Sequence, residues 1–255
     1  MSHLTELFIL FVGLSVGSFL NVCIYRIPRG LSLISPGSSC PKCGKRIQWY
    51  ENIPLVSFLL LRGRCSGCRT PIPIRYPIVE CLTGVAYLVL FWQYGLGESF
   101  VYYALFISLL IAISFIDLDH KIIPDMISIP GMVIGVVGAY WIPRITIWES
   151  LAGLLMGGGI LFIVAWGYYL LTRREGMGGG DIKLLAMIGA FLGWQMVPQV
   201  LFLGALSGAV VGGCLMLFKG SGRHTEIPFG PFLSFGASIS LFLPKLQEIL
   251  LLPLK

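Results

Sequence analysis

Eight long apolar stretches, separated by short polar segments, constrain this chain more than any other feature. They lie near residues 4–25, 78–97, 99–117, 126–142, 147–171, 182–198, 200–218 and 228–244. A helix needs about 20 apolar residues to cross a bilayer. Only 12% of the 255 residues are charged, whereas soluble domains carry about 25%. The sequence therefore predicts an all-α polytopic membrane protein with about eight transmembrane helices in a lipid bilayer.

The positions of the basic residues predict how these helices are oriented. Nine of the 18 Lys and Arg residues lie between Arg26 and Arg75. If the amino terminus lies outside the cytoplasm, fifteen basic residues fall in inner loops, and only Arg144, Lys245 and Lys255 fall outside. Lys and Arg are in excess on the cytoplasmic side of membrane proteins. We therefore attribute the net charge of +6 to topology and expect no nucleic-acid partner.

The first apolar run, residues 4–25, is predicted to be a permanent membrane anchor. No Lys or Arg precedes it, and Arg26 follows it. A secretory signal peptide shows the opposite order, because its positive charge comes before its apolar run. The sequence thus predicts three parts. They are a transmembrane anchor over 1–25, a small cytoplasmic segment over 26–76, and a membrane domain with seven helices over 77–255.

The cytoplasmic segment carries two Cys-x2-Cys pairs. Cys40 and Cys43 form the first pair, and Cys65 and Cys68 form the second after 21 intervening residues. Two such pairs are typical of a structural zinc site with four thiolate ligands. Disulfides and redox chemistry are the alternatives, although the predicted cytoplasmic location disfavours disulfides. A segment of about 50 residues has little core of its own, so metal binding would supply part of its folding energy.

Glycines beside the cysteine pairs favour tight turns. Gly44 follows the first pair, and Gly67 lies within the second. Both are predicted to turn the backbone so that the two sulfurs of a pair face the same ion. The other cysteines, Cys23, Cys81 and Cys214, lie in apolar segments and are predicted to pack as small apolar side chains.

Aspartates lie at the ends of two apolar segments. Asp117 ends the third segment, and Asp181 precedes the sixth, directly after the three glycines at 178–180. A carboxylate at the edge of a membrane helix is costly and therefore indicates function. The predicted topology places both aspartates on the cytoplasmic face. Two carboxylates can hydrolyse a peptide when one, ionised, takes a proton from water and the other, protonated, polarises the carbonyl.

Neighbouring residues leave other interpretations open. Asp119 can be a solvated charge, Asp125 can cap the following helix, and His120 can tune a carboxylate. The residues alone place catalysis among the four aspartates without choosing firmly between them. A proton-coupled transporter is a further alternative. Such a protein usually carries its carboxylates at mid-span and has an internal repeat, neither of which is evident in this sequence.

Seven stretches occur along the chain in the order of one known family. They are GSFLNVCIYRIP (17–28), the two Cys-x2-Cys pairs, NIPLVSFLLLRGRC (52–65), IRYPIVE (74–80), IDLDHKIIPD (116–125), GMGGGDIKLLAMIGAFLGW (176–194) and IPFGPFL (227–233). Together they resemble the bacterial type IV prepilin peptidases, which are leader peptidases and N-methyltransferases of pili and type II secretion. The resemblance implies that Asp117 and Asp181, the latter in a Gly-x-Gly-Asp motif, form the catalytic pair of a membrane aspartic peptidase.

The resemblance also implies the substrates, the location and a second reaction. The substrates would be type IV prepilins and type II secretion pseudopilins, each with a short basic leader before an apolar helix. The enzyme would lie in the bacterial inner membrane with its active site at the cytoplasmic face. It would then methylate the new amino terminus from S-adenosylmethionine, with Arg64, Arg75 and Glu80 as candidate contacts for this cofactor. The alternative is a peptidase without methylation, in which the zinc segment recognises the leader.

Overall fold

The computed structural model of the protein describes residues 3–174, 176–219 and 227–243, and in these residues it is all-helical apart from two isolated β-bridges. It divides into two compact units, Met1–Ala112 and Ile113–Lys255, whose boundary falls inside helix α4. The division into three parts that the sequence favours stays a prediction.

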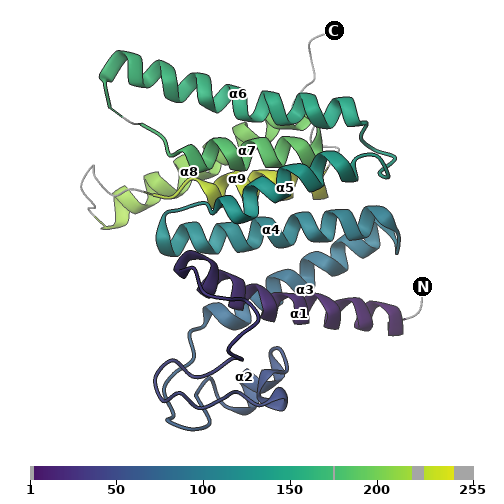
Figure 1. Ribbon diagram of the computed structural model, residues 1–255, viewed down its shortest axis with the longest axis vertical. Helices are drawn as coiled ribbons and strands as arrows, with labels where there is room; N and C mark the ends of the chain where they lie inside the picture. Colours follow the sequence, from purple (N-terminus) through teal and green to yellow (C-terminus); the bar gives the residue numbers. More distant parts are fainter. Residues whose placement is uncertain (1–2, 175, 220–226, 244–255) are drawn as a thin grey trace. The chain divides into compact units, whose positions relative to one another are not determined.

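In the first unit, α1 (His3–Arg26) packs along α3 (Arg75–Tyr94) (Figure 1). Two glycines of α1 allow this approach. A Cβ atom on Gly13 would lie 2.8 Å from the α3 backbone, and one on Gly17 would lie 2.7 Å from it. Small residues four positions apart let helices approach closely in lipid. This glycine pair therefore packs α1 against α3.

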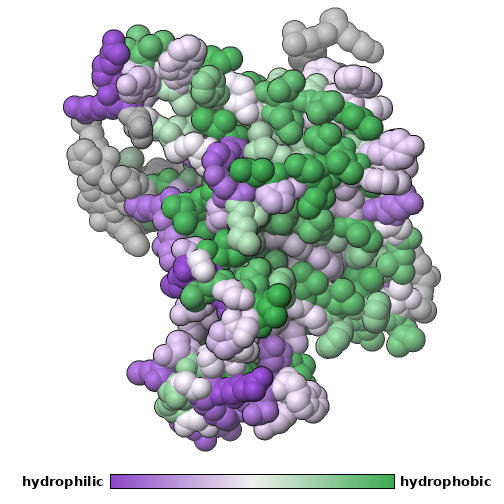
Figure 2. Space-filling view, viewed as in Figure 1, coloured by the Kyte–Doolittle hydropathy of each residue, from purple (hydrophilic) through white to green (hydrophobic). Residues whose placement is uncertain are grey.

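The chain between α1 and α3 forms a small lobe, which we call the cysteine lobe (residues 27–74). It contains the 3-10 helices η1 (Ile27–Arg29) and η2 (Trp49–Asn52) and the short helix α2 (Val56–Leu60). Figure 2 shows hydrophilic residues over much of this lobe and apolar residues over most of the helical surface. The polar surface of the lobe suits a segment that lies outside the lipid.

The second unit is built around α7. Its elements are the end of α4 (Glu98–His120), α5 (Asp125–Gly138), α6 (Ile147–Thr172), α7 (Gly179–Leu192), η3 (Trp194–Met196), α8 (Val197–Lys219) and α9 (Gly230–Phe242) (Figure 1). Helix α7 contacts α5, α6, α8 and α9, and all of its residues from 184 to 191 are buried. Contacts on several sides therefore fix the position of this short helix.

Glycines bring the backbones of α6 and α7 into direct contact. Gly153 on α6 faces Gly189 on α7, and a Cβ atom on either residue would overlap the backbone of the other. Gly157, one turn further along α6, lies equally close to the α7 backbone. The Ser150 hydroxyl donates a 2.6 Å hydrogen bond to the carbonyl of Ala190 and so ties the two helices together.

Each of the eight predicted membrane segments overlaps a helix, although α7 ends at Leu192, before the predicted end of its segment at 198. Among the described residues, five helices are long and apolar enough to cross a membrane, namely α1, α3, α4, α6 and α8. Helix α7 has only 14 residues, which rise about 21 Å against a hydrocarbon core of about 30 Å. The fold is thus that of an all-α multi-pass membrane protein, and the count of eight spans stays a prediction. Arg223, Lys245 and Lys255, which enter the charge count, lie outside the described residues.

Candidate active site and metal centre

The two aspartates predicted to be catalytic lie on different helices of the second unit. Asp117 is in the last turn of α4 and is 5% exposed. Asp181 is in the first turn of α7 and is half-buried. The side chain of Ile123 lies between their surroundings, against Gly180, which precedes Asp181, and against Gly230, which contacts Asp117, although 64 positions separate the two aspartates in the sequence. Helix packing therefore brings the predicted pair together.

The start of α9 also contributes to this site. The backbone N–H of Gly230, the first residue of α9, donates a 3.0 Å hydrogen bond to Oδ2 of Asp117. The N–H groups of a first helical turn have no partner within the helix, and the helix dipole favours negative charge there. A Cβ atom at position 230 would lie 2.6 Å from the same carboxylate oxygen, so glycine suits this position. Gly230 lies in the stretch IPFGPFL (227–233), and no local pattern there indicates a contact with Asp117.

The space beside the aspartates is narrow on one side and open on the other. A Cβ atom on Gly180 would lie 2.9 Å from Cβ of Ile123, and one on Gly230 would lie 3.3 Å from Cδ1 of Ile123. A Cβ atom on Gly178 or Gly179 would meet nothing within 4 Å. The two open glycines thus leave room for an extended peptide backbone at the entrance of α7.

The neighbours of Asp117 occupy other environments. Asp119 is exposed, and His120 is half-buried at the end of α4. Asp125 forms a 2.6 Å ion pair with Lys183 of α7, and the start of α5 has no side-chain cap. The capping role predicted for Asp125 is therefore wrong, because its carboxylate points to another helix. The ion pair is exposed and contributes at most about 1 kcal/mol, but it links α5 to α7 near the site.

The four predicted metal ligands come together in the cysteine lobe. Their sulfur atoms all lie within 4.8 Å of one another. The sulfurs of Cys40 and Cys68 are 3.8 Å apart, and those of Cys43 and Cys65 are 4.0 Å apart. A tetrahedral zinc ion with Zn–S bonds of about 2.3 Å places sulfurs about 3.8 Å apart. The residues therefore fit a metal site with four thiolate ligands.

The two cysteine pairs are held by turns of the same kind. In each turn, the backbone N–H of the first cysteine donates to the carbonyl five residues later. Gly44 has a φ of 70°, which confirms its predicted turn role. In the second turn, Arg69 takes the position of positive φ, at 59°. Gly67 lies within this turn, as predicted, and its N–H donates to the Cys65 sulfur at 3.4 Å. It also lies against the Lys45 side chain, where a Cβ atom would come within 3.1 Å.

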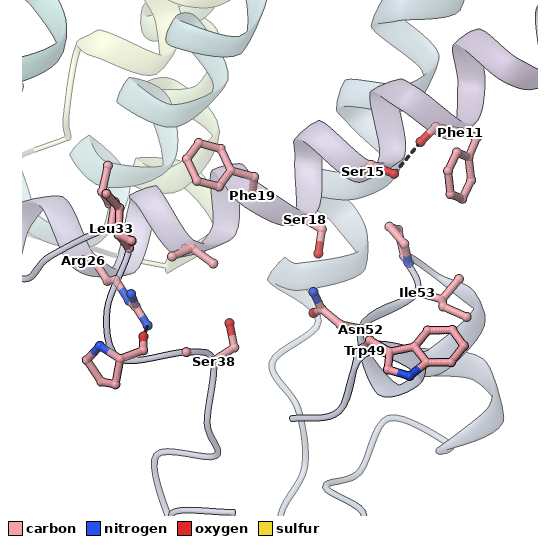
Figure 3. A pocket seen from close by; sticks show the side chains of 15 residues that line it. Phe11, Ser15, Ser18, Phe19, Arg26, Leu33, Ser38, Trp49, Asn52 and Ile53 are labelled. Atoms are coloured by element: carbon pink, nitrogen blue, oxygen red, sulfur yellow. Dashed lines mark hydrogen bonds between the residues drawn. The ribbon is translucent and has the colours of Figure 1, made fainter. Parts of the chain in front are cut away.

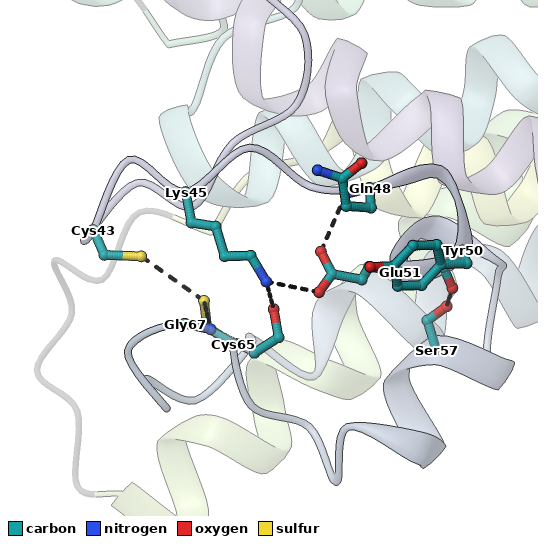
Figure 4. Close-up of polar contacts among 9 residues, drawn as sticks. Cys43, Lys45, Gln48, Tyr50, Glu51, Ser57, Cys65 and Gly67 are labelled. Carbon is teal, nitrogen blue, oxygen red and sulfur yellow. Dashed lines mark hydrogen bonds and ion pairs between the residues drawn. The ribbon is translucent and has the colours of Figure 1, made fainter.

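Lys45 connects the two turns (Figure 4). Its ammonium group donates to the Glu51 carboxylate at 2.9 Å and to the Ser66 hydroxyl at 2.6 Å. The same carboxylate accepts the Gln48 backbone N–H at the start of η2. Hydrogen bonds from Ser66 and Lys45 lower the pKa of Glu51 to about 2. Because Lys45 follows the first cysteine pair and Ser66 lies in the second, this network helps to set the distance between the pairs.

Hydrogen bonds favour thiolates at the metal site. The sulfur of Cys68 lies 3.2 Å from the Thr70 hydroxyl, and hydrogen bonds from Thr70 lower the pKa of Cys68 to about 6. Hydrogen bonds from the backbone of Cys43 and Lys42 lower the pKa of Cys40. The thiolate, rather than the thiol, is the form that binds metal. Cys68 is therefore prepared for metal at neutral pH, whereas burial and hydrogen bonds with neighbouring cysteine sulfurs raise the pKa of Cys43 to about 11.

The three residues predicted to contact S-adenosylmethionine do not share one surface. Arg75 and Glu80 line a cavity of about 650 Å³ in the first unit, whereas Arg64 is exposed and is not among the residues that line it. A neighbouring hollow of about 470 Å³ adjoins the cavity (Figure 3), and Ser18 lines both. In Figure 3 the side chain of Ser18 on α1 points toward Asn52 of the lobe.

An aspartate pair held by packed membrane helices, together with a four-cysteine lobe, is the arrangement expected of a membrane aspartic peptidase. Comparison with known families gives the same result. A model of the bacterial peptidase A24 N-terminal domain matches residues 11–94, and a model of the type IV leader peptidase family matches residues 104–213. The chain therefore belongs to the type IV leader peptidase family, as the resemblance of its motifs implied.

Curated relatives are similar along nearly the whole chain. The prepilin leader peptidase/N-methyltransferase of Pseudomonas putida is 39% identical over 253 residues, which cover 90% of this chain and 88% of the relative. The protein of the same name from Myxococcus xanthus is 41% identical over 224 residues, which cover 88% of this chain and 67% of the relative. That of Pseudomonas aeruginosa is 37% identical and covers similar shares, 90% and 87%. No solved structure gives a significant match.

Proposed function

We propose that the protein is an aspartic endopeptidase that removes the leader from type IV prepilins and type II secretion pseudopilins. The observation that carries this proposal is the meeting of Asp117 and Asp181 at the ends of α4 and α7. The charge distribution in the sequence favours the cytoplasmic face of the bacterial inner membrane for these helix ends. A leader that stays outside the lipid, followed by an apolar helix within it, would present its scissile bond at this depth.

The proposed mechanism divides the work between the two carboxylates. One aspartate, ionised, takes a proton from water, and the resulting hydroxide attacks the carbonyl carbon of the scissile peptide. The other, protonated, donates a hydrogen bond to the carbonyl oxygen, and a proton then reaches the leaving nitrogen. Asp117 suits the ionised role, because the Gly230 N–H stabilises a carboxylate. Asp181 then takes the protonated role.

The second proposed activity is methylation of the new amino terminus from S-adenosylmethionine. The carbon–sulfur bond of the donor breaks and a carbon–nitrogen bond forms, while the amine loses a proton and the sulfonium becomes a neutral thioether. The cysteine lobe is too short for a doubly wound nucleotide-binding domain. The donor must therefore bind among the lobe and the helices that flank it. Arg75 and Glu80, which line one cavity, are the proposed contacts, whereas Arg64 lies outside that lining.

Zinc is the proposed metal of the cysteine lobe, and its role is structural. The support is the spacing of the sulfurs of Cys40, Cys43, Cys65 and Cys68, which matches tetrahedral thiolate coordination. With four protein ligands the metal has no open position for a substrate. It would stabilise a lobe that has few buried side chains.

Charge argues against leader recognition as the function of the lobe. Residues 26–76 contain nine Lys and Arg residues and one acidic residue, Glu51, which is already paired with Lys45. A basic leader would meet like charge on this segment, and such juxtaposition costs affinity. Methylation is therefore favoured over the peptidase-only alternative.

The test is an assay of the purified protein in detergent with a prepilin and labelled S-adenosylmethionine. We expect leader cleavage by mass spectrometry and incorporation of label into the shortened product. An intact substrate, under conditions in which the protein is folded and contains metal, would overturn the proposed peptidase. Cleavage without label would leave the peptidase and remove the methyltransferase.

A further inference from the structure

The cavity of about 650 Å³ in the first unit is lined by α1, the cysteine lobe and the start of α3. Ligand sites typically have volumes of about 300–1,000 Å³, so the cavity can hold a nucleoside with an amino-acid tail. Its lining contains six Lys and Arg residues and the aromatic rings of Tyr25, Phe58 and Tyr76. Against this basic background, one buried acidic side chain stands out.

Glu80 places a carboxylate at the wall of this cavity. The residue is 7% exposed, and no Lys or Arg of the residues that the structure describes forms an ion pair with it. Burying a carboxylate without a cationic partner is costly. A cation brought by a ligand would offset this cost. Without such a cation, burial favours the neutral carboxyl, so a positively charged ligand group is the partner that would stabilise the ionised form of Glu80.

A strained turn holds Glu80 in place. Leu55 has φ 59° and ψ −46°, and the Val56 N–H donates to the carbonyl of Pro54 at 2.6 Å. This is a γ-turn with positive φ at its centre, a rare and strained conformation. It directs the Leu55 N–H at Oε2 of Glu80, 2.9 Å away. Strain of this kind is found at ligand clamps, where the surrounding structure maintains it.

Asn21 on α1 supplies a second acceptor, and the residue is 1% exposed. Its amide nitrogen donates to the carbonyls of Gly17 and Tyr76 at 3.3 and 3.1 Å. These two bonds fix the orientation of the amide, because a flipped amide would place oxygen against two carbonyl oxygens. The remaining atom, Oδ1, is buried and accepts no hydrogen bond from the described residues. A buried acceptor without a partner is destabilising, because it has lost its hydrogen bonds to water.

The two acceptors belong to the same helix contact. Gly17, one turn before Asn21, approaches the backbone of Glu80 so closely that a Cβ atom would lie 2.7 Å from its Cα. Asn21 and Glu80 both line the cavity beside this contact. When Glu80 is ionised, its carboxylate oxygens and Oδ1 of Asn21 can only accept hydrogen bonds. Together these acceptors favour a cationic ligand group over a neutral or anionic one.

We propose that Glu80 and Asn21 hold the cationic end of S-adenosylmethionine, its sulfonium and ammonium groups, in this cavity. The assignment rests on the proposed methyl transfer and names the chemistry by which the donor is recognised. Arg75 is placed to meet the carboxylate of the donor, and the aromatic rings can stack on its adenine. After transfer the sulfonium is a neutral thioether. Its attraction to Glu80 is then lost, which favours release of the product.

The experiment compares S-adenosylmethionine with S-adenosylhomocysteine, which lacks one methyl group and one positive charge. Calorimetry on the full-length protein in detergent should show at least about tenfold tighter binding of the charged nucleoside, a difference of about 1.4 kcal/mol. Glu80→Gln keeps the shape and an acceptor for the Leu55 N–H but removes the charge. For this variant, the ratio of the two affinities, S-adenosylmethionine over S-adenosylhomocysteine, should fall to about one. Glu80→Asp, which keeps the charge, should retain a preference.

Glu98→Gln is the matched control, because Glu98 is an exposed carboxylate in the first turn of α4. The Glu98→Gln variant should keep the wild-type ratio of affinities for the two nucleosides. Asn21→Ser is an independent variant that keeps a small polar group, and it should weaken binding of S-adenosylmethionine about tenfold. If Glu80→Gln does not fold, as judged by zinc content and melting temperature, the affinity of Asn21→Ser for S-adenosylmethionine tests the proposed site instead.

Two results would overturn the proposal in distinguishable ways. If the wild-type protein binds neither nucleoside and transfers no methyl group, the proposed methyl transfer is wrong and this site is wrong with it. If the wild-type protein methylates its substrate while folded Glu80→Gln keeps the wild-type preference, the methyl transfer stands and only the site is wrong. Unchanged affinity in folded Asn21→Ser would likewise remove Asn21 from the site.

Discussion

The backbone N–H of Gly230 binds the carboxylate of Asp117 across 113 positions of sequence. Gly230 begins α9, and Asp117 lies near the end of α4, so the first turn of α9 becomes part of the proposed active site. The contact positions one oxygen of the carboxylate and leaves no space for a side chain at position 230. A backbone group, rather than a side chain, thus orients one member of the aspartate pair.

The first prediction concerns this contact. Gly230→Ala would place a Cβ atom 2.6 Å from Oδ2 of Asp117 and force the carboxylate to move. Displacing a catalytic group by about 1 Å can cost about 10²-fold in rate, so we expect a loss of this size in kcat for prepilin cleavage. The control is Gly213→Ala in α8, where an added Cβ meets nothing within 4 Å. Equal activity in both variants would contradict a role for the contact.

Cleavage is predicted to require both aspartates. Asn is nearly isosteric with Asp but can act neither as a general base nor as an acid, so Asp117→Asn or Asp181→Asn should each remove nearly all turnover. The expected loss is about 10³-fold or more, since members of one catalytic unit are strongly non-additive. Asp119→Asn, in an exposed position of the same helix, is the control and should be milder. Normal cleavage by Asp117→Asn together with failure of Asp119→Asn would show that the pair is wrongly assigned.

One zinc ion per chain is predicted in the cysteine lobe. Cys65→Ser removes one of four thiolates and should lose most of the metal, measured by elemental analysis of the purified protein. Its melting temperature should also fall, because metal binding contributes to folding. Cys214→Ser, on an exposed part of α8, should keep full zinc content. Equal zinc in the two variants would refute the assignment.

Cleavage and methylation are predicted to be separable. The methyl acceptor is an amine that exists only after the leader has gone, so Asp181→Asn should block both reactions on intact prepilin. The same variant should still methylate a peptide supplied already cut, with a free amino-terminal Phe, because methyl transfer needs no aspartate pair. The measurement is incorporation of label into this peptide. A folded, zinc-containing Asp181→Asn protein that transfers no methyl group would mean that the two sites are shared or coupled.

The orientation in the membrane is predicted from the charges. With eight spans and an outer amino terminus, a reporter fused after Lys255 should behave as periplasmic. A reporter fused after Arg174, at the end of α6, should behave as cytoplasmic. A cytoplasmic signal from the fusion after Lys255 would mean that the number of spans is odd.

The helices could be predicted from the sequence because each is an apolar run with a local boundary. Helix α3 ends at Gly95 and α7 at Gly193, both with positive φ, and such stops are visible in the sequence. The cysteine cluster was equally accessible, since the spacing of its ligands is a local pattern. These features need no knowledge of which helices touch.

Contacts between distant segments could not be predicted in this way. Asp125 reads as a cap from its neighbours, yet its partner is Lys183 on another helix. Arg69, rather than the glycine nearby, adopts the left-handed turn of the second cysteine pair, because the fold outweighs the local preference for glycine. Asn21 lies in an apolar run and became a candidate only when its buried oxygen proved to lack a partner among the described residues.

The glycine pair between α6 and α7 limits how this protein can change. Gly153 and Gly189 touch backbone to backbone, and the helix that carries Gly189 begins with the turn that holds Asp181. A larger residue at either position cannot be compensated by a smaller one opposite, because no residue is smaller than glycine. Altered substrate preference must therefore be sought in the loops and at other helix faces. Such variants would have to keep the position of α7, the helix that supports Asp181, unchanged.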